Sequence, residues 1–465
     1  MWKFDLTQFD SVWKIIVNLL LLLTALLIGN AIRRIVPLFK KAFIPSALIG
    51  GLLLFLANIF STNVCNYELI DMRIMQIITY HALAIGFIAM SLKIVEKGKA
   101  KTGVSAIQNG LITGGTYMLQ AVVGILIGLI FFWAGTGLFY DAGVILPLGY
   151  GQGPGNALTW DINFGEYGLD SSGSFGLTIA SVGFVVASIV GVIYINIFKK
   201  KGEISERDKN VVRSVNDFET DNEIEDSDSV DKTSIQVAFV AICYGLSFLI
   251  MVFFAKLTEW TGVKIFNDIA WGFNFIWGVI TATLVRSVIK HLQKKNILRK
   301  RYINNYQMDR ISGFAFDLMI IAGVAAIDIN VVTKYIWVIV ALCVAGAIVT
   351  VIYVRMMTKI AFKGYEHEAF LINFGTLTGT ASNGMILLRE IDPNFETPMC
   401  NIFIVSQFPA MVAVAPLLLL LSTGSKTYNG CLITLGIFAV LFVVYTIASI
   451  VIAKKRKTAE KGENL

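Results

Sequence analysis

Charge is scarce in this chain: Asp, Glu, Lys and Arg make up only 15% of 465 residues, against 56% hydrophobic residues. A soluble globular protein usually carries about 25% charged residues. The composition therefore excludes a soluble fold and indicates a protein that crosses a membrane many times. Histidine is equally rare, with three residues, and the five cysteines have no paired spacing. These shortages argue against a metal centre or a disulfide framework, and we expect no cofactor.

Enzymatic motifs are missing as well. The sequence contains no HExxH, no GxSxG at a strand-to-helix turn and no Walker loop, so we do not predict a membrane-embedded enzyme. The net charge of +7 could suggest nucleic acid as a partner. In a membrane protein such a charge more often reflects basic cytoplasmic loops, so no nucleic acid is expected.

Eleven segments have the roughly 20 mostly apolar residues that a membrane helix needs. They are 12–30, 44–60, 75–92, 103–134, 173–198, 234–258, 269–289, 311–330, 334–354, 397–422 and 428–452. Two further segments, 141–165 and 366–391, are apolar but interrupted by Gly, Pro, Asn, Ser and Thr. By composition alone, each of these two could be a full span or a re-entrant hairpin.

The distribution of Lys and Arg decides between these alternatives, because basic residues concentrate in cytoplasmic loops. If both interrupted segments are hairpins, the inside loops hold 30 basic residues and the outside segments hold six. If 141–165 crossed instead, the basic loops 199–233 and 290–310 would lie outside. We therefore predict two hairpins, the first entering from outside and the second from inside. The N-terminus is expected outside and the C-terminus in the cytoplasm, in a bacterial inner (plasma) membrane.

This topology predicts an all-α polytopic membrane protein with two inverted repeats of five transmembrane helices, each with one re-entrant hairpin. Five is odd, so the two halves have opposite orientations. The first repeat is 1–198 and the second is 234–422, followed by an extra helix and basic tail at 423–465. The cytoplasmic linker 199–233 contains "NDFETDNEIEDSDSVD", with eight acidic and no basic residues. Such a segment is predicted to be disordered because it cannot bury enough apolar surface to fold.

Glycine and polar residues gather in the two interrupted segments. The first reads "LPLGYGQGPGNALTW" (146–160) and the second "NFGTLTGTASNGMILLREIDP" (373–393). Irregular backbone survives in a membrane only where protein or a watery cavity surrounds it. Two such breaks at corresponding positions of two halves indicate a substrate site. A helix that begins there points free N–H groups and partial positive charge at the cavity, which favours an anion such as a carboxylate.

These considerations give two sets of candidate residues. The predicted substrate-binding residues are Gly151, Gln152, Gly153, Gly155, Asn156, Thr378, Gly379, Thr380, Ser382, Asn383 and Arg389. The predicted sodium ligands are Asn373, Thr376, Asp317 and Gly149. Three alternatives stay open: the glycines could be helix-packing positions, Asp317 could be a structural partner, and Arg389 could be an interfacial anchor. A potassium filter at "GYG" is disfavoured because the second half has no counterpart.

The motifs resemble those of the sodium/glutamate symporter family. The similarity rests on "FIPSALIGGLLL" (43–54), on "GYGQGPGNA" leading into "LTW", and on "GTASNGM" followed by "REIDP". The sequence departs from the family pattern in its long acidic linker, its last helix and its Gly-Tyr-Gly-Gln-Gly motif. In addition, Gln120 in the fourth span has no counterpart in 334–354. The resemblance implies a homodimer in which a part bearing the hairpins moves in an elevator-like manner.

Together these features predict a secondary transporter that couples sodium to the uptake of a small anionic substrate, glutamate by resemblance. A sodium-coupled carrier or exchanger of another small organic anion is the alternative, and an ion channel is less favoured. The expected partners are the substrate, sodium as the coupling ion, the lipid bilayer and a second copy of the chain.

Overall fold

The computed structural model describes residues 13–94, 100–204, 231–263, 265–298, 300–393, 396–424 and 426–462. The structure is 84% helix, and these ranges contain no strand. The prediction of an all-α protein is therefore confirmed. Most of the acidic linker, and with it the predicted disorder, lies outside the described residues.

Ten helices among the described residues are long and apolar enough to cross a membrane. They are α1 (Lys14–Ile35), α3 (Ser46–Cys65), α4 (Met72–Leu92), α5 (Ala100–Trp133), α8 (Ser174–Lys200), α9 (Lys232–Thr261), α11 (Asn274–Lys294), α14 (Ile336–Ala361), α17 (Met399–Gly424) and α18 (Tyr428–Gly462). They correspond to ten of the eleven predicted spans. The other predicted span, 311–330, corresponds to α12 (Asn305–Ala325), which carries three charged residues and ends before the short helix α13 (Ile329–Lys334).

Side chains define where several of these helices begin. Asp71 accepts a hydrogen bond from the Ile74 amide at the start of α4, at 3.0 Å. Asn304 accepts one from the Gln307 amide at the start of α12, at 2.8 Å. Such caps satisfy amides that have no partner within the helix. The spans predicted from hydropathy begin a few residues after these caps, because an average over many apolar residues does not detect a single capping residue.

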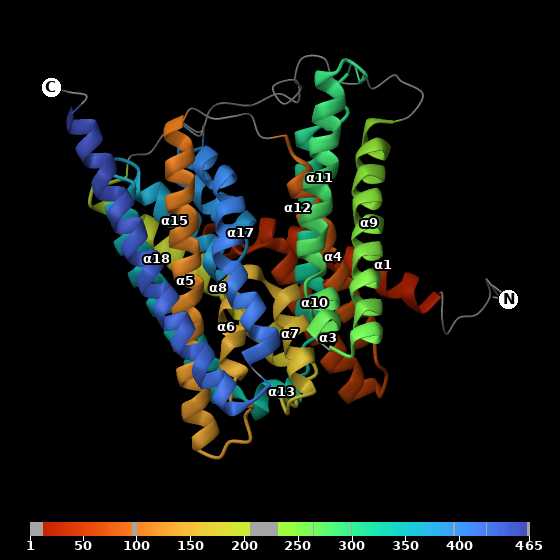
Figure 1. Cartoon of the computed structure of the whole chain (residues 1–465). Coiled ribbons are helices and arrows are strands. Elements are labelled where there is room, and N and C mark those ends of the chain that lie inside the picture. Colours follow the sequence, from red (N-terminus) through yellow and green to blue (C-terminus); the bar gives the residue numbers. More distant parts are fainter. Residues whose placement is uncertain are drawn as a thin grey trace.

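The helices form two groups (Figure 1). α1, α3, α4, α9, α11 and α12 lie on one side of the molecule, and α5, α8, α15 (Glu366–Thr378), α17 and α18 lie on the other. Within the first group α4 packs along α12, and within the second α5 packs along α17, α18 and α14. The helix α7 (Pro154–Gly165) lies between the groups and contacts both α4 and α12. Two short helices, α2 (Pro37–Lys41) and α10 (Ile265–Gly272), complete the connections of the first group.

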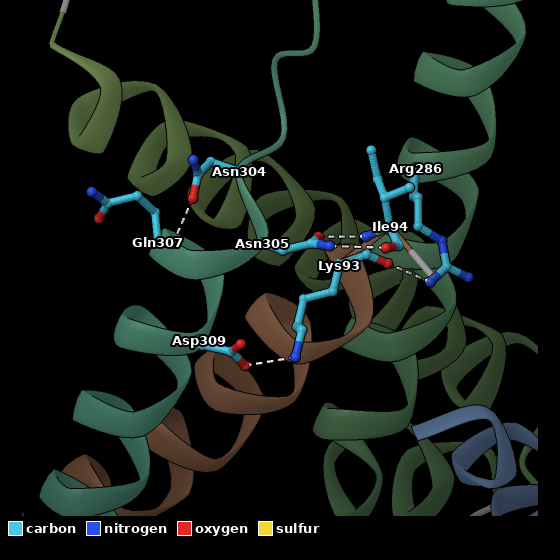
Figure 2. Close-up of polar contacts among 7 residues, drawn as sticks. All are labelled: Lys93, Ile94, Arg286, Asn304, Asn305, Gln307 and Asp309. Atoms are coloured by element: carbon cyan, nitrogen blue, oxygen red, sulfur yellow. Dashed lines mark hydrogen bonds and ion pairs between the residues drawn. The ribbon is translucent and has the colours of Figure 1, made fainter. Parts of the chain in front are cut away.

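Polar contacts hold the end of α4 against the start of α12 (Figure 2). The Asn305 side chain donates to the carbonyl of Ile94 at 2.9 Å and accepts from its amide at 2.7 Å. The Lys93 ammonium lies 2.7 Å from Asp309, and Arg286 of α11 donates to the Lys93 carbonyl at 3.0 Å. Three helices of the first group are thus tied together at one end, which favours their behaving as one unit.

Each of the two interrupted segments is a pair of helical arms. The first consists of η2 (Ala142–Val144), α6 (Ile145–Pro147), the π-helical turn η3 (Leu148–Gln152) and α7. The second consists of α15 and α16 (Ala381–Ile391), separated by Gly379 and Thr380. The second arm of each segment therefore begins at a break in the middle of an otherwise apolar segment.

Candidate functional site

The first break centres on Gly153. This residue has φ +81°, in the left-handed region that side chains with a Cβ rarely adopt, and it is followed by Pro154 at the start of α7. Proline fits the first helical position because its missing N–H would have had no partner there. No side chain among the described residues caps α7. The first-turn amides of α7 therefore lack both a helical and a side-chain partner.

The second break has a matching form. α15 ends at Thr378, Thr380 is extended, and α16 begins at Ala381 with no side-chain cap from the described residues. A Cβ on Gly379 would lie 2.4 Å from Nδ2 of Asn383. Glycine at 379 is thus what leaves room for the Asn383 amide beside the break.

The two breaks meet in space. A Cβ built on Gly153 would lie 3.6 Å from Cγ2 of Thr380 and 3.4 Å from Cε of Met319 on α12. Segments that the sequence separates by more than 200 residues therefore place two helix starts next to each other. Because both starts carry the positive end of a helix dipole, the space around them favours a negative group.

Unsatisfied polar atoms gather around the second break. The described residues contain nine buried side-chain N or O atoms without a hydrogen-bond partner, and four of them belong to Gln120, Asn373, Thr380 and Asn383. All four side chains are at most 8% exposed. An unpaired buried polar atom costs roughly 1–3 kcal/mol. Four such atoms near one break indicate a place where a ligand supplies the missing partners.

Other predicted residues of the first break are linked to one another. Asn156 donates a hydrogen bond to Oε1 of Gln152, and Gln152 also bonds to the Tyr117 hydroxyl of α5. Glycines 149, 151 and 155 lie against Ile179, Tyr117 and Leu83, each closer than a Cβ would permit. These three glycines therefore serve close packing, whereas a Cβ at Gly153 would make only ordinary van der Waals contacts, at 3.4 Å or more.

At the second break, too, the predicted residues are engaged in close packing and in hydrogen bonds within the segment. A Cβ on Gly375 would lie 2.8 Å from Cα of Gly384, so the two arms of this segment touch through backbone. Thr376 and Thr378 each donate a hydrogen bond within α15, to Ile372 and Phe374. Their oxygens retain the capacity to accept a further bond or to contact a cation.

Three predicted residues lie away from the meeting point. Arg389 is exposed in the last turn of α16, about 15 Å along the helix from Gly379 at 1.5 Å per residue. Ser382 is also exposed. Asp317 is half-buried on α12, one turn before Ile321, which lies against Gly51 of α3, whereas Met319 and Gly323 of α12 face the first break. Helical periodicity therefore places Asp317 toward α3 rather than toward the breaks.

Two fully buried carboxylates were missed by sequence reasoning. Asp161 of α7 accepts hydrogen bonds from the Gly176 amide at 2.7 Å, the Gly173 amide at 3.3 Å and the Ser171 hydroxyl. Asp392, just after α16, accepts from the amides of Glu396 at 2.9 Å and Thr397 at 3.0 Å. Each carboxylate fixes the exit of an interrupted segment to the start of the next long helix. An acid within an apolar segment is the signal that could have found Asp161.

Ten apolar helices, with polar breaks buried among them, define a multi-pass integral membrane protein. Within this class, the family model described as sodium/glutamate symporter matches residues 11–380, and the chain belongs to that family. The matched region contains the whole first break and α15 of the second. No curated protein matches the chain. The resemblance noted in the sequence is thereby confirmed, and the protein is a transporter.

Proposed function

We propose that this chain is a sodium-coupled glutamate symporter whose substrate binds where the two breaks meet. The observation that carries the proposal is the close approach of Gly153 and Thr380, which brings two uncapped helix starts together. Their amides supply N–H donors to a carboxylate without the desolvation cost of a buried cationic side chain. The proposed binding set comprises Gly151, Gln152, Gly153, Gly155, Asn156, Thr378, Gly379, Thr380, Ser382, Asn383 and Arg389.

Within this set the structure supports some members more than others. Thr380 and Asn383 offer an unpaired hydroxyl oxygen and an unpaired amide nitrogen at the break itself. Gln152 and Asn156 form a hydrogen-bonded pair across the first break. Arg389 and Ser382 lie on the exposed side of α16, and a direct role for them requires a change of conformation.

Sodium is proposed to bind beside the substrate, at Asn373, Thr376 and Gly149, with Asp317 as a further candidate. Asn373 has the strongest support, since its fully buried amide oxygen has no partner among the described residues. Neutral oxygens at broken helices are typical sodium ligands in secondary transporters. Binding of sodium and substrate to the same conformation makes each raise the apparent affinity of the other.

The inverted-repeat architecture with two re-entrant hairpins is also part of the proposal. Its support is the correspondence between the halves: Asp161, near the end of α7, and Asp392, just after α16, each accept hydrogen bonds from backbone amides of the chain that leads into the next long helix. Furthermore, each break bonds to the fourth long helix of the other half. Tyr150 donates to the Cys343 carbonyl of α14 at 2.7 Å, and Gln120 of α5 donates to the Leu377 carbonyl at 3.0 Å.

Transport is proposed to follow an elevator-like mechanism in a homodimer, with the N-terminus outside and the C-terminus in the cytoplasm. The separation into two helix groups, with α15 packed within the second group and α7 at the boundary between them, supports a moving part and a fixed part (Figure 1). The two groups touch along α4, α12 and α7, and close contacts there involve glycine. Gly155 lies against Leu83, and Gly323 against Pro154.

Uptake by the purified full chain in proteoliposomes tests the function. Labelled glutamate is expected to accumulate only with an inward sodium gradient, and competing dicarboxylates are expected to inhibit weakly. Uptake without any dependence on sodium would contradict the coupling. Transport of a different organic anion in place of glutamate would favour the alternative carrier or exchanger, and uncoupled current would favour a channel.

Cysteine labelling tests the topology. In a Cys65→Ser background, we expect Gly137→Cys to react only with reagent added outside and Lys363→Cys only with reagent inside, since both positions are exposed. Reaction of both positions from the same side would contradict the hairpin assignment, because the two loops would then lie on one face of the membrane.

A further inference from the structure

Two buried side-chain amides are hydrogen-bonded to α15, the first arm of the second break: one belongs to α5 and the other to α15 itself. Gln120 of α5 donates from Nε2 to the Leu377 carbonyl at 3.0 Å and to Oγ1 of Thr350 at 2.8 Å. Asn373 of α15 donates from Nδ2 to the Ala369 carbonyl at 2.8 Å. A carbonyl can only accept, so these bonds fix which amide atom is nitrogen and which is oxygen. The oxygens of both side chains consequently point elsewhere.

These two oxygens have no hydrogen-bond partner in the part of the chain that the structure describes, although both side chains are 0% exposed. Leu377 and Asn373 are one helical turn apart on α15, so both amides are anchored along the same face of that arm. Amide oxygens that accept no hydrogen bond are suited to bind a small cation. Because the amides are neutral, the empty site leaves no buried charge in the membrane.

A relay of hydrogen bonds holds the Asn373 amide in this orientation. Nδ2 of Asn373 also donates to Oδ1 of Asn109 on α5 at 2.8 Å. Nδ2 of Asn109 donates to Oγ of Ser406 on α17 at 2.9 Å, and Ser406 donates to the Phe403 carbonyl at 2.8 Å. Both hydrogens of Asn373 Nδ2 and the hydroxyl hydrogen of Ser406 are used, and the side chains of Asn373, Asn109 and Ser406 are at most 1% exposed. Asn109 therefore has no freedom to turn its amide over.

We propose that α5 forms one wall of the sodium site: Gln120 supplies an oxygen ligand, and Asn109 is a positioning residue that aims the Asn373 oxygen at the ion. The inference rests on the proposed sodium coupling and extends it to two residues of α5. The second hydrogen of the Gln120 amide is held by α14, where the Thr350 hydroxyl accepts it.

The test separates sodium binding from glutamate binding. Gln120→Met removes the amide at nearly constant volume, and Asn109→Leu breaks the relay. Both variants are expected to raise the sodium concentration for half-maximal uptake by about tenfold or more, whereas the glutamate KM at saturating sodium stays within about twofold. Asn109→Asp retains the oxygen that accepts from Asn373 and is expected to recover most of the sodium affinity.

Gln108 provides a matched control. It is also a fully buried amide of α5, but it bonds to the Ser449 carbonyl and to Arg456 of α18. Gln108→Met is expected to leave the sodium requirement unchanged. The inference is overturned if Gln120→Met and Asn109→Leu keep wild-type sodium dependence, or if Gln108→Met shifts it equally.

A second measurement does not depend on transport. Sodium alone is expected to raise the melting temperature of the purified wild-type chain, and Gln120→Met is expected to lose most of that rise. An identical sodium-dependent rise in Gln120→Met would overturn the α5 site while leaving sodium coupling intact. No rise in the wild type, together with sodium-independent uptake, would instead overturn the proposed function itself.

Discussion

Gly153→Ala tests whether the shape of the first break governs substrate binding. Gly153 has φ +81° and ψ −171°, and a residue with a Cβ costs about 1–3 kcal/mol in this region, which is essentially restricted to glycine. The added methyl group has room, since its nearest neighbours would be Met319 at 3.4 Å and Thr380 at 3.6 Å. The substitution therefore perturbs backbone conformation without a steric clash. Because 1.4 kcal/mol corresponds to a factor of ten, the glutamate KM should rise roughly 5- to 150-fold.

Gly137→Ala is the matched control for this prediction. Gly137 has φ +71° and nothing within 4 Å of its added Cβ, but it lies in an exposed loop before the first interrupted segment. Both variants should lower the free energy of unfolding by a similar amount, whereas only Gly153→Ala should alter the glutamate KM in proteoliposome uptake. A wild-type KM for Gly153→Ala, or an equal increase for Gly137→Ala, would refute the reasoning.

Two predictions concern the regions that hold the site in place. Asp161→Ala leaves the buried Gly176 amide without its acceptor and should lower the free energy of unfolding by about 3 kcal/mol. As a control, Asp170→Ala, which removes an exposed ion pair with Lys334, should change the free energy of unfolding by less than about 1 kcal/mol. Equal effects of the two substitutions would contradict the role of Asp161. The Lys14 ammonium, 2.6 Å from Asp71, holds the pKa of that carboxyl below its ordinary value. Its stabilising effect should therefore be complete above the unfolded pKa of about 3.9. This stabilisation should disappear as the pH falls through the lowered folded pKa of Asp71. The melting temperatures of wild type and Asp71→Asn should therefore converge in acid. A constant difference between the two melting temperatures down to pH 2 would contradict the ion pair's role.

The long helices could be predicted from the sequence because a membrane span is defined by the length and hydropathy of one continuous segment. α12 was the weakest case, since Asp309, Arg310 and Asp317 interrupt its apolar character. The positions of the two breaks were also predictable, because Gly153 and Gly379 lie in clusters of glycine and polar residues that lipid would not tolerate.

The assignment of individual roles was not predictable to the same degree. Whether a glycine serves close packing depends on its neighbours in space: a Cβ on Gly151 would clash with Tyr117 at 2.5 Å, whereas one on Gly153 would have its nearest neighbour at 3.4 Å. The direction in which Asp317 points depends on how α12 is rotated against α3. Likewise, the unpaired oxygens of Gln120 and Asn373 become apparent only once the partners of their amide nitrogens are known.

The most direct test of the central claim is glutamate binding to Thr380→Val, measured in sodium by calorimetry. The hydroxyl of Thr380 is buried and unpaired, so for a purely structural residue its replacement by an isosteric apolar group is neutral or stabilising. We predict an unchanged or higher melting temperature together with at least about tenfold weaker glutamate binding. Thr358→Val serves as the control and should leave glutamate affinity unchanged, because the buried Thr358 hydroxyl is bonded to the Val354 carbonyl at 2.8 Å and lies outside the proposed binding set. Wild-type glutamate affinity in Thr380→Val would contradict the claim that substrate binds where the two breaks meet.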